Sequence, residues 1–245
     1  MKALVIIPTF NERDNLPLLV PAVLAHEGVH VLIVDDQSPD GTGDVAEALA
    51  RAHPSRVGVL HRTGPRGLGR SYAEGLTRAI RGDADVVVQM DADLSHDPGE
   101  LPALIEAAAH EDLAIGSRYQ PGGQIRNWPV HRRLLSAGAN HYIRLVTRLD
   151  VRDCTSGFRC WRREALARVP LDEVTSEGYA FLVEMLYAAV RAGLRVTEVP
   201  IVFVERRLGR SKLSFPVLLE SMRAPWRLRR HTPGPRPEPH PSHLR

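Results

Sequence analysis

The acidic residues Asp91 and Asp93, separated by one alanine, are the feature of this sequence best suited to chemistry. Two carboxylates this close repel each other, and a divalent cation would relieve the repulsion. Carboxylate oxygens are hard ligands, and Mg²⁺ or Mn²⁺ commonly joins a few of them to a diphosphate. Two exposed acids in a turn give the same pattern, so the pair alone leaves both interpretations open. A second acidic pair, Asp35 and Asp36, and many downstream arginines favour a metal–diphosphate site.

Two other nucleotide-binding motifs are missing from the sequence. A dinucleotide-binding domain needs GxGxxG directly after its first strand, where this chain has PTFNE at residues 8–12. The glycines Gly67 and Gly69 predict a tight turn into the next helix, which could lie near a ligand. No P-loop motif (GxxxxGK followed by Ser or Thr) occurs, which excludes a P-loop NTPase.

The acidic pair has to be positioned by strands and helices that alternate along the chain. Runs rich in Val, Ile and Leu predict strands at residues 3–7, 30–34, 56–60, 85–90 and 113–116. Apolar residues at helical spacing predict helices at residues 16–25, 44–52, 71–80 and 101–110. This alternation predicts an α/β fold with a mostly parallel central sheet flanked by helices.

Polar motifs follow four of these predicted strands, at residues 8–12, 35–42, 91–96 and 116–119. Right-handed crossovers place the carboxyl ends of parallel strands at one edge of a sheet, where the ligands of such folds bind. Any single motif is explained as well by a solvated loop or a helix cap. Together, the four motifs predict a binding site at that edge.

The pattern changes in the second half of the chain. A glycine-rich loop (residues 120–127) leads into a predicted helix at residues 130–148, and DCTSGFR follows at residues 153–159. A further helix is predicted around residues 179–192, and a strand at residues 195–204 runs into ERRLGRSK at residues 205–212. Residues 232–245 contain five prolines and predict a disordered tail.

The composition is that of an ordinary globular chain. Of the 245 residues, 43 % are hydrophobic and 25 % are charged, and the formal net charge is +3. This charge is too small to indicate a nucleic-acid partner, so none is expected. The apolar run at residues 3–7 is too short for a signal peptide, and no run reaches the roughly 18 apolar residues of a membrane span. We therefore expect a cytoplasmic location.

The motifs PTFNE, DDQSPDGT, DADLSH and GSRY, each after a predicted strand, resemble those of family 2 glycosyltransferases with a GT-A fold. DCTSGFR and ERRLGRSK are similar to segments of the dolichol-phosphate (polyprenol-phosphate) mannose synthases within that family. The resemblance covers residues 1–215, with the motifs in the family's order. It implies an enzyme that transfers mannose from the nucleotide sugar GDP-mannose to a polyprenyl (dolichyl-type) monophosphate.

The resemblance also implies which residues bind the nucleotide and the metal. The implied nucleotide-binding residues are Pro8, Phe10, Glu12, Asp36, Asp40 and Asp91. The implied metal, Mg²⁺ or Mn²⁺, would face Asp91, Asp93 and Ser95. The family often has Gln at the position of Ser95. Because a hydroxyl reaches less far than an amide, Ser95 would bind the metal through water.

The residues that the resemblance assigns to the acceptor phosphate and the reaction, beside the acidic pair, are Arg118, Arg132, Ser136, Arg206 and Lys212. A phosphate nucleophile is already anionic at neutral pH, so it needs orientation and charge neutralisation more than a strong base. Arginine suits this task because its guanidinium holds phosphate oxygens in a bidentate fork. Arg132 and Ser136 are four residues apart and would project from one helix face. A solvated basic face is the alternative, and it suits the neighbouring Arg133 and Arg207.

The implied reaction is a single inverting displacement that yields a β-linked polyprenyl-phosphate sugar. Three alternatives stay open: a polyprenyl-phosphate glucose synthase using UDP-glucose, a transferase with a sugar acceptor, and a catalytically inactive subunit that binds sugar nucleotides. The sequence lacks a QxxRW segment, which disfavours a processive polysaccharide synthase. It also lacks a glycine-rich arginine loop after the first strand, which disfavours a nucleotidyltransferase.

These patterns divide the chain into a GT-A catalytic domain (residues 1–213), an amphipathic helix (214–231) and the proline-rich tail (232–245). The helix combines Trp226 and other apolar residues with four arginines, which is typical of a helix that lies on a membrane surface. It would attach the chain peripherally to the cytoplasmic face. Packing against its own domain is equally compatible with the pattern. A membrane-anchored partner protein is another route to the lipid.

Overall fold

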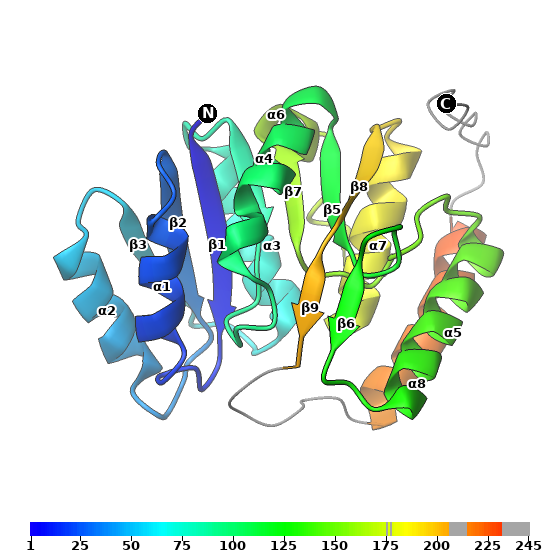
Figure 1. Ribbon diagram of the computed structural model, residues 1–245, viewed down its shortest axis with the longest axis horizontal. Coiled ribbons are helices and arrows are strands. Elements are labelled where there is room, and N and C mark those ends of the chain that lie inside the picture. The colour runs from blue at the N-terminus through cyan, green and yellow to red at the C-terminus, as the bar shows by residue number, and fades with distance from the viewer. Residues whose placement is uncertain (175, 177, 206–214, 232–245) are drawn as a thin grey trace.

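The computed structural model describes residues 1–174, 176, 178–205 and 215–231. Within these residues a seven-stranded sheet forms the centre of the molecule (Figure 1). Its strands, in spatial order, are β3 (Val57–His61), β2 (Val29–Asp35), β1 (Ala3–Thr9), β4 (Val86–Gln89), β7 (Arg159–Arg162), β5 (Leu113–Ser117) and β8 (Val196–Pro200). A separate pair of short parallel strands consists of β6 (Gln124–Arg126) and β9 (Val202–Val204).

Helices cover both faces of the sheet (Figure 1). One face is covered by α1 (Leu16–Leu24), α2 (Thr42–Ala52) and α4 (Leu101–His110), the last preceded by a 3-10 turn at Pro98–Glu100. The other face is covered by α3 (Leu68–Ile80), α6 (Arg163–Leu166) and α7 (Gly178–Arg191). Two further helices, α5 (Val130–Thr147) and α8 (Phe215–His231), stand side by side at one end of the molecule.

The sequence-based prediction of an α/β fold with a mostly parallel sheet is confirmed, with three corrections. The predicted glycine-rich loop at residues 120–127 contains the short strand β6. The strand β7 was not predicted, and it lies antiparallel between β4 and β5. The strand predicted at residues 195–204 is two strands, because the chain changes partners at Ile201. The N–H of Ile201 donates to the Ser117 carbonyl on β5 (3.1 Å), whereas its carbonyl accepts from the N–H of Gln124 at the start of β6 (2.9 Å).

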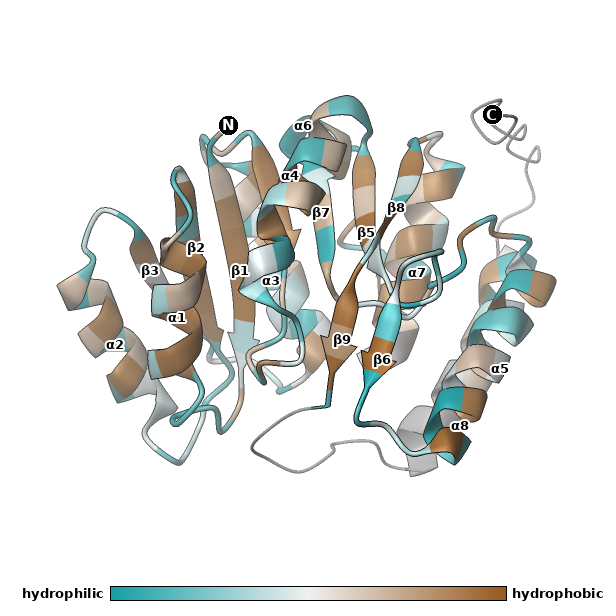
Figure 2. Cartoon of the chain, in the orientation of Figure 1, coloured by the Kyte–Doolittle hydropathy of each residue, from teal (hydrophilic) through white to brown (hydrophobic). Residues whose placement is uncertain are grey.

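Alternate residues of the central strands point to opposite faces of the sheet and build two apolar cores. In β1, Val5 and Ile7 pack against α1 and α4, whereas Ile6 packs against α3 on the other face. Because both faces are covered, the strands are apolar almost throughout, as the brown colour of β1 and β2 shows (Figure 2). The burial of both faces fixes the register of the strands and therefore the position of the loops that follow them.

The helix α8 packs against α5 and α7 and exposes its remaining side. Ala224 and Leu228 are buried, whereas Met222 and Trp226 are exposed. The Tyr142 hydroxyl donates to the Met222 carbonyl across the two helices (2.7 Å). No helix in the described part of the chain is both long enough and apolar enough to cross a bilayer. The predicted disordered tail, residues 232–245, lies outside the described residues.

Candidate active site

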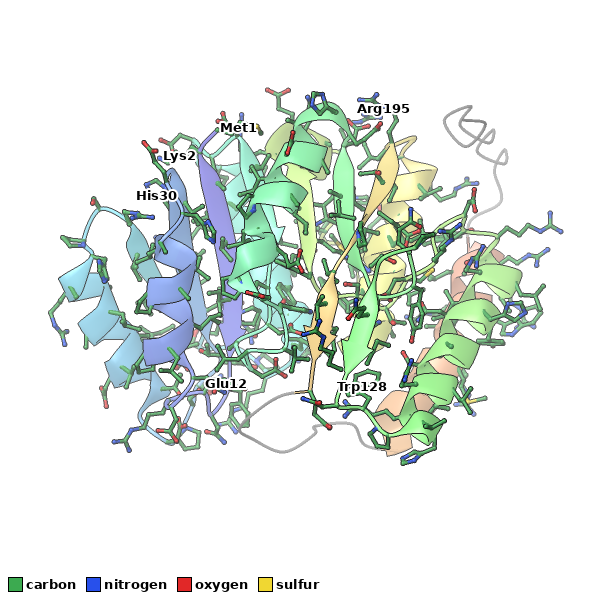
Figure 3. All side chains as sticks on the ribbon, viewed as in Figure 1. Met1, Lys2, Glu12, His30, Trp128 and Arg195 are labelled. Carbon is green, nitrogen blue, oxygen red and sulfur yellow. The ribbon has the colours of Figure 1, made fainter. Side chains whose placement is uncertain are left out.

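A cavity of about 510 Å³ opens at the carboxyl edge of the sheet. Loops that follow β1, β2, β4 and β5 line it, as expected from the polar motifs at these strand ends. Glu12 and Trp128, labelled in Figure 3, both lie at this edge of the molecule. Within the described residues, four carboxylates and three guanidiniums line the cavity. The cavity therefore offers groups for both cations and phosphates.

Nine of the residues predicted from the sequence meet at this cavity. They are Pro8, Phe10, Glu12, Asp36, Asp91, Asp93, Ser95, Arg118 and Arg132. Asp40 and Ser136 do not line it. Arg206 and Lys212 lie outside the described residues. The structure thus brings together groups that are separated by up to 124 positions along the chain, from residue 8 to residue 132.

The carboxylate of Asp40 is engaged at the start of α2. It accepts hydrogen bonds from the backbone N–H of Thr42 (3.0 Å) and from its hydroxyl (2.5 Å). Burial alone would raise the pKa of Asp40, but these hydrogen bonds outweigh it and lower the pKa. Ser136 lies one turn after Arg132 on α5, beside the Tyr119 hydroxyl, and its carbonyl accepts from the Asn140 amide (3.1 Å). Both residues therefore have structural contacts of their own.

The acidic pair Asp91 and Asp93 begins directly after β4, at the centre of the cavity lining. Asp91 Oδ1 accepts a hydrogen bond from the Tyr72 hydroxyl (2.9 Å). Asp93 Oδ1 accepts one from the backbone N–H of Ser95 (3.1 Å), which closes a tight turn. The turn brings the Ser95 side chain back to the cavity. The two carboxylates and this hydroxyl therefore come from one short loop.

The donor set of this loop fits Mg²⁺ or Mn²⁺. It offers only hard oxygen atoms, and such ions are often held by one or two carboxylates together with substrate phosphates. Within the described residues, no cluster of three or more His, Cys, Asp or Glu side chains could hold a metal by itself. A metal at this loop would therefore take its remaining ligands from water or from a phosphate-bearing substrate.

The predicted nucleotide-binding residues Phe10 and Asp36 each have an arginine partner. The Arg66 guanidinium lies 4.9 Å from the centre of the Phe10 ring, and it donates to the Gln37 carbonyl (3.0 Å). The buried Asp36 carboxylate accepts hydrogen bonds from the Arg62 guanidinium and from the Gly67 N–H (2.8 Å). These contacts tie the loops after β1, β2 and β3 into one wall of the cavity.

Arg118 forms a buried bidentate ion pair with Asp153. Its Nε and Nη2 donate to the two carboxylate oxygens, at 2.7 and 2.6 Å, and Nη2 also donates to the Thr155 hydroxyl (2.7 Å). Burial alone would raise the pKa of Asp153, but the Arg118 guanidinium outweighs it and lowers the pKa. The pair joins β5 to the DCTSGFR segment, which supplies Thr155, Ser156 and Gly157 to the cavity.

Arg132 lines the cavity among aromatic rings. Its guanidinium is 4.0 Å from the centre of the Trp128 ring, and its Nη1 donates to Glu205 (2.7 Å). The Trp128 ring contacts Phe203 edge to face, with 5.4 Å between the ring centres. Glu205 is the residue directly before the segment 206–214, which contains the predicted Arg206 and Lys212.

His96 also lines the cavity, although its place after the acidic pair favoured a loop residue over one that approaches the metal. Its ring stacks on Phe158, with 5.0 Å between the ring centres, and its Nδ1 accepts from the backbone N–H of Asp91 (3.2 Å). Burial lowers the pKa of His96, so the imidazole is neutral at pH 7. The neutral ring therefore acts as a hydrogen-bond acceptor that supports the acidic loop.

Several lining residues were not predicted, and their sequence signals differ. His96 belongs to the DADLSH motif, so its neighbours could have indicated it. Arg66 lies beside the turn at Gly67 and Gly69, which the sequence indicated as a turn that could lie near a ligand. Trp128 and Phe203 belong to no motif, and they meet only because β6 pairs with β9. No local pattern could have paired residues 75 positions apart.

A family model described as Glycosyl transferase family 2 matches residues 4–169. The chain belongs to glycosyl transferase family 2. This membership makes it a glycosyltransferase and confirms the family suggested by the motifs at the strand ends.

Curated relatives of this family 2 glycosyltransferase act on lipid phosphates, according to their names. The polyprenol monophosphomannose synthase of Mycolicibacterium smegmatis is 50 % identical over 90 % of this chain and 84 % of the relative. The undecaprenyl-phosphate mannosyltransferase of Micrococcus luteus is 46 % identical over 91 % of each chain. The dolichol-phosphate mannosyltransferase of Pyrococcus furiosus is 40 % identical over 93 % of this chain but only 64 % of its own length.

Solved structures that resemble this glycosyltransferase confirm the GT-A fold. Glucosyl-3-phosphoglycerate synthase of Mycobacterium tuberculosis, in complex with Mn²⁺ and UDP-glucose, gives a TM-score of 0.64 at 18 % identity, covering 91 % of this chain and 75 % of that one. The same synthase in complex with UDP gives 0.64 at 16 % identity, covering 93 % and 79 %. At these identities the likeness concerns the fold alone.

Proposed function

We propose that this glycosyltransferase moves a mannosyl unit from GDP-mannose to a polyprenyl (dolichyl-type) monophosphate, with inversion, giving polyprenyl-phosphate β-mannose. The observation that carries the proposal is the 50 % and 46 % identity, over 90 % and 91 % of this chain, to enzymes named as polyprenol- and undecaprenyl-phosphate mannose transferases. The cavity supports it, because carboxylates and guanidiniums from separate loops face one space and both substrates carry phosphate.

In this proposal the two substrates occupy opposite ends of the cavity. The nucleotide binds beside Phe10, Glu12 and Asp36, and its sugar reaches Asp91. The acceptor phosphate binds between Arg118 and Arg132, with Ser136, Arg206 and Lys212 as further acceptor-side residues. Asp40 supports the loop after β2 through its hydrogen bonds to Thr42. The acidic loop at Asp91 and Asp93 lies between the two ends.

The proposed reaction is a single displacement at the anomeric carbon. An oxygen of the acceptor phosphate forms the new bond, the bond to the β-phosphate oxygen of GDP breaks, and its electron pair leaves with GDP. The nucleophile is ionised before it binds, so no residue has to remove a proton. Arg132 orients the acceptor phosphate, while Asp91 and Asp93 hold the donor side. A divalent cation bound at the acidic loop would neutralise charge on the departing diphosphate.

The exposed faces of α5 and α8 support a role at a membrane. Exposed apolar side chains gather on these two helices: Val130, Leu134, Leu135, Leu145, Met222 and Trp226. Hydrophobic and hydrophilic bands alternate along α5 (Figure 2), and exposed arginines accompany the apolar residues of α8. Apolar side chains with Trp and flanking arginines are typical of helices at a lipid surface. We therefore propose peripheral binding to the cytoplasmic face of a membrane.

A transfer assay with labelled sugar nucleotides tests the proposed function. The chain is incubated with undecaprenyl phosphate, Mg²⁺ or Mn²⁺, and either GDP-mannose or UDP-glucose. We expect labelled lipid from GDP-mannose. We also expect Asp93→Ala to reduce the transfer rate by about a hundredfold or more, because a metal contributes several kcal/mol of charge stabilisation.

Two further measurements complete this test. The melting temperature of Asp93→Ala should stay close to that of the unsubstituted chain, since Asp93 lies in a loop at the cavity. Chelation of the metal should stop transfer by the unsubstituted chain. Transfer from UDP-glucose only would contradict the donor assignment, and near-normal turnover of Asp93→Ala would contradict the metal assignment.

A further inference from the structure

Tyr72 contacts Asp91, a residue of the cavity lining, without lining the cavity itself. Neither the sequence motifs nor the proposed reaction gives Tyr72 a role. Its side chain is fully buried on α3, and its ring stacks parallel to Phe181, with 6.0 Å between the ring centres. Its hydroxyl donates to Asp91 Oδ1 at 2.9 Å. A phenylalanine would fill nearly the same volume, so the packing explains the ring but not the hydroxyl.

The Tyr72 hydroxyl is the donor of this hydrogen bond, because a carboxylate oxygen can only accept one. The contact therefore ties one oxygen of the Asp91 carboxylate to α3.

Asp91 is constrained from two other directions. Its backbone N–H donates to His96 Nδ1 (3.2 Å). On the side of Gly157, a Cβ atom would lie 3.3 Å from Asp91 Oδ2, so the backbone approaches the carboxylate closely. Among the hydrogen bonds of the described residues, the one from the Tyr72 hydroxyl is the one that reaches the Asp91 carboxylate.

We propose that Tyr72 is a positioning residue that holds the Asp91 carboxylate in the orientation needed to bind a divalent metal and, through that metal, the diphosphate. The inference rests on the proposed function, in which Asp91 faces both groups. Residues behind metal ligands commonly orient them, and their loss typically lowers metal affinity or activity by about 10- to 100-fold. If the Tyr72 hydroxyl only withdrew negative charge from Asp91, removing the hydroxyl would strengthen metal binding. A positioning role predicts the opposite, a loss of metal affinity.

The variant Tyr72→Phe tests the proposal, because it keeps the ring and removes one oxygen atom. Binding of Mn²⁺ is measured on the full chain by electron paramagnetic resonance in the presence of GDP. We expect the Kd for Mn²⁺ to rise about tenfold or more. The affinity for GDP in the presence of EDTA should change less than about twofold, since the positioned group acts on the metal. A variant that had only lost packing would change the affinities for Mn²⁺ and for GDP to a similar extent.

Tyr142→Phe is the matched control. It also removes a tyrosine hydroxyl that donates a hydrogen bond, to the Met222 carbonyl, but on α5, away from the cavity lining. Its Kd for Mn²⁺ should equal that of the unsubstituted chain. If Tyr72→Phe does not fold, Asp91→Glu replaces it in the measurement. This variant keeps the negative charge but displaces the carboxylate oxygen that accepts the hydrogen bond from Tyr72. Asp91→Glu should then show the same loss of Mn²⁺ affinity.

A Kd for Mn²⁺ that is unchanged or lower in Tyr72→Phe would overturn the positioning role, as would an unchanged Kd in Asp91→Glu. Asp93→Asn, measured alongside, separates this failure from failure of the proposed function. If Asp93→Asn loses Mn²⁺ affinity while Tyr72→Phe keeps it, only the role of Tyr72 is wrong. If Asp93→Asn also binds Mn²⁺ normally, the assignment of the metal site to the acidic loop is wrong. The proposed role of Tyr72 is then wrong as well.

Discussion

Two arginines line the proposed acceptor end of the cavity, and their ion pairs differ in exposure. The side chains of Arg118 and Asp153 are 6 % and 0 % exposed, whereas those of Arg132 and Glu205 are 30 % and 37 % exposed. Breaking a buried pair leaves an uncompensated charge and costs about 3–5 kcal/mol, whereas an exposed pair contributes roughly 0–1 kcal/mol. A phosphate could therefore displace Glu205 from Arg132 at little cost. Arg118 would stay paired with Asp153 throughout the reaction.

This difference predicts that Arg132 governs acceptor binding. We expect Arg132→Ala to raise the acceptor KM about tenfold or more, because hydrogen bonds to charged groups contribute about 1.5–3 kcal/mol. The donor KM should change less than about twofold. Arg133→Ala is the control, since Arg133 is the exposed neighbour on the same helix and does not line the cavity. Steady-state kinetics with each substrate varied in turn measures both constants. A larger change in the donor KM would refute the division of the cavity.

At the scale of elements, glycines allow α3 to lie close to its neighbours. A Cβ atom at Gly75 would lie 2.6 Å from the Ile6 side chain and 3.1 Å from Val34, so the helix rests directly on β1 and β2. A Cβ atom at Gly69 would lie 2.6 Å from the Ser176 carbonyl, near the start of α7. This close approach brings Tyr72 within hydrogen-bond distance of Asp91. The packing of one helix thus sets a contact at the acidic loop.

We expect Gly75→Ala to lower the free energy of unfolding by up to about 2 kcal/mol. The added methyl overpacks the core, which costs about 1–3 kcal/mol, and the better helix propensity of alanine offsets about 1 kcal/mol of this. Gly138→Ala on α5 is the control, because a Cβ atom there meets nothing within 4 Å. It should raise the free energy of unfolding by about 0.5–1 kcal/mol. Urea denaturation measures the free energy of unfolding of both variants. Equal values for Gly75→Ala and Gly138→Ala would show that the contact between α3 and the sheet can accept an added methyl group.

At the scale of the whole molecule, the cavity and the exposed apolar helices share one element. Near its beginning, α5 carries Arg132 into the cavity lining, and Leu134 and Leu135, two and three positions later, are exposed. The helix α8 lies beside α5 and adds Met222 and Trp226. A lipid acceptor could therefore keep its chain in a membrane beneath these helices while its phosphate reaches Arg132.

Vesicle binding tests this arrangement. We expect the chain to pellet with vesicles of phosphatidylcholine and phosphatidylglycerol, and the double variant Leu135→Ser with Trp226→Ser to lose at least about half of that binding. Leu18→Ser is the matched control, because Leu18 is as exposed as Leu135, at 59 %, but lies on α1. All three proteins should melt at similar temperatures. If the double variant and the control pellet equally, α5 and α8 do not contribute to membrane binding.

The sequence by itself determined the fold class, the family and most of the cavity. Apolar runs of four to six residues predicted β1 to β5, with ends within two residues of those observed. The polar motifs after β1, β2, β4 and β5 then had to meet, because parallel strands end at one edge of a sheet. This local information was enough to bring Glu12, Asp91 and Arg118 to one cavity.

Only the tertiary structure decided the partners of these groups. The antiparallel β7 between β4 and β5, the pairing of β6 with β9, and the Arg118–Asp153 ion pair join residues far apart in the chain. Hydrophobic periodicity describes one element at a time and carries no record of which elements become neighbours. For the same reason, the sequence could not show that Asp40 and Ser136 lie outside the cavity lining, or that a buried tyrosine on α3 reaches Asp91.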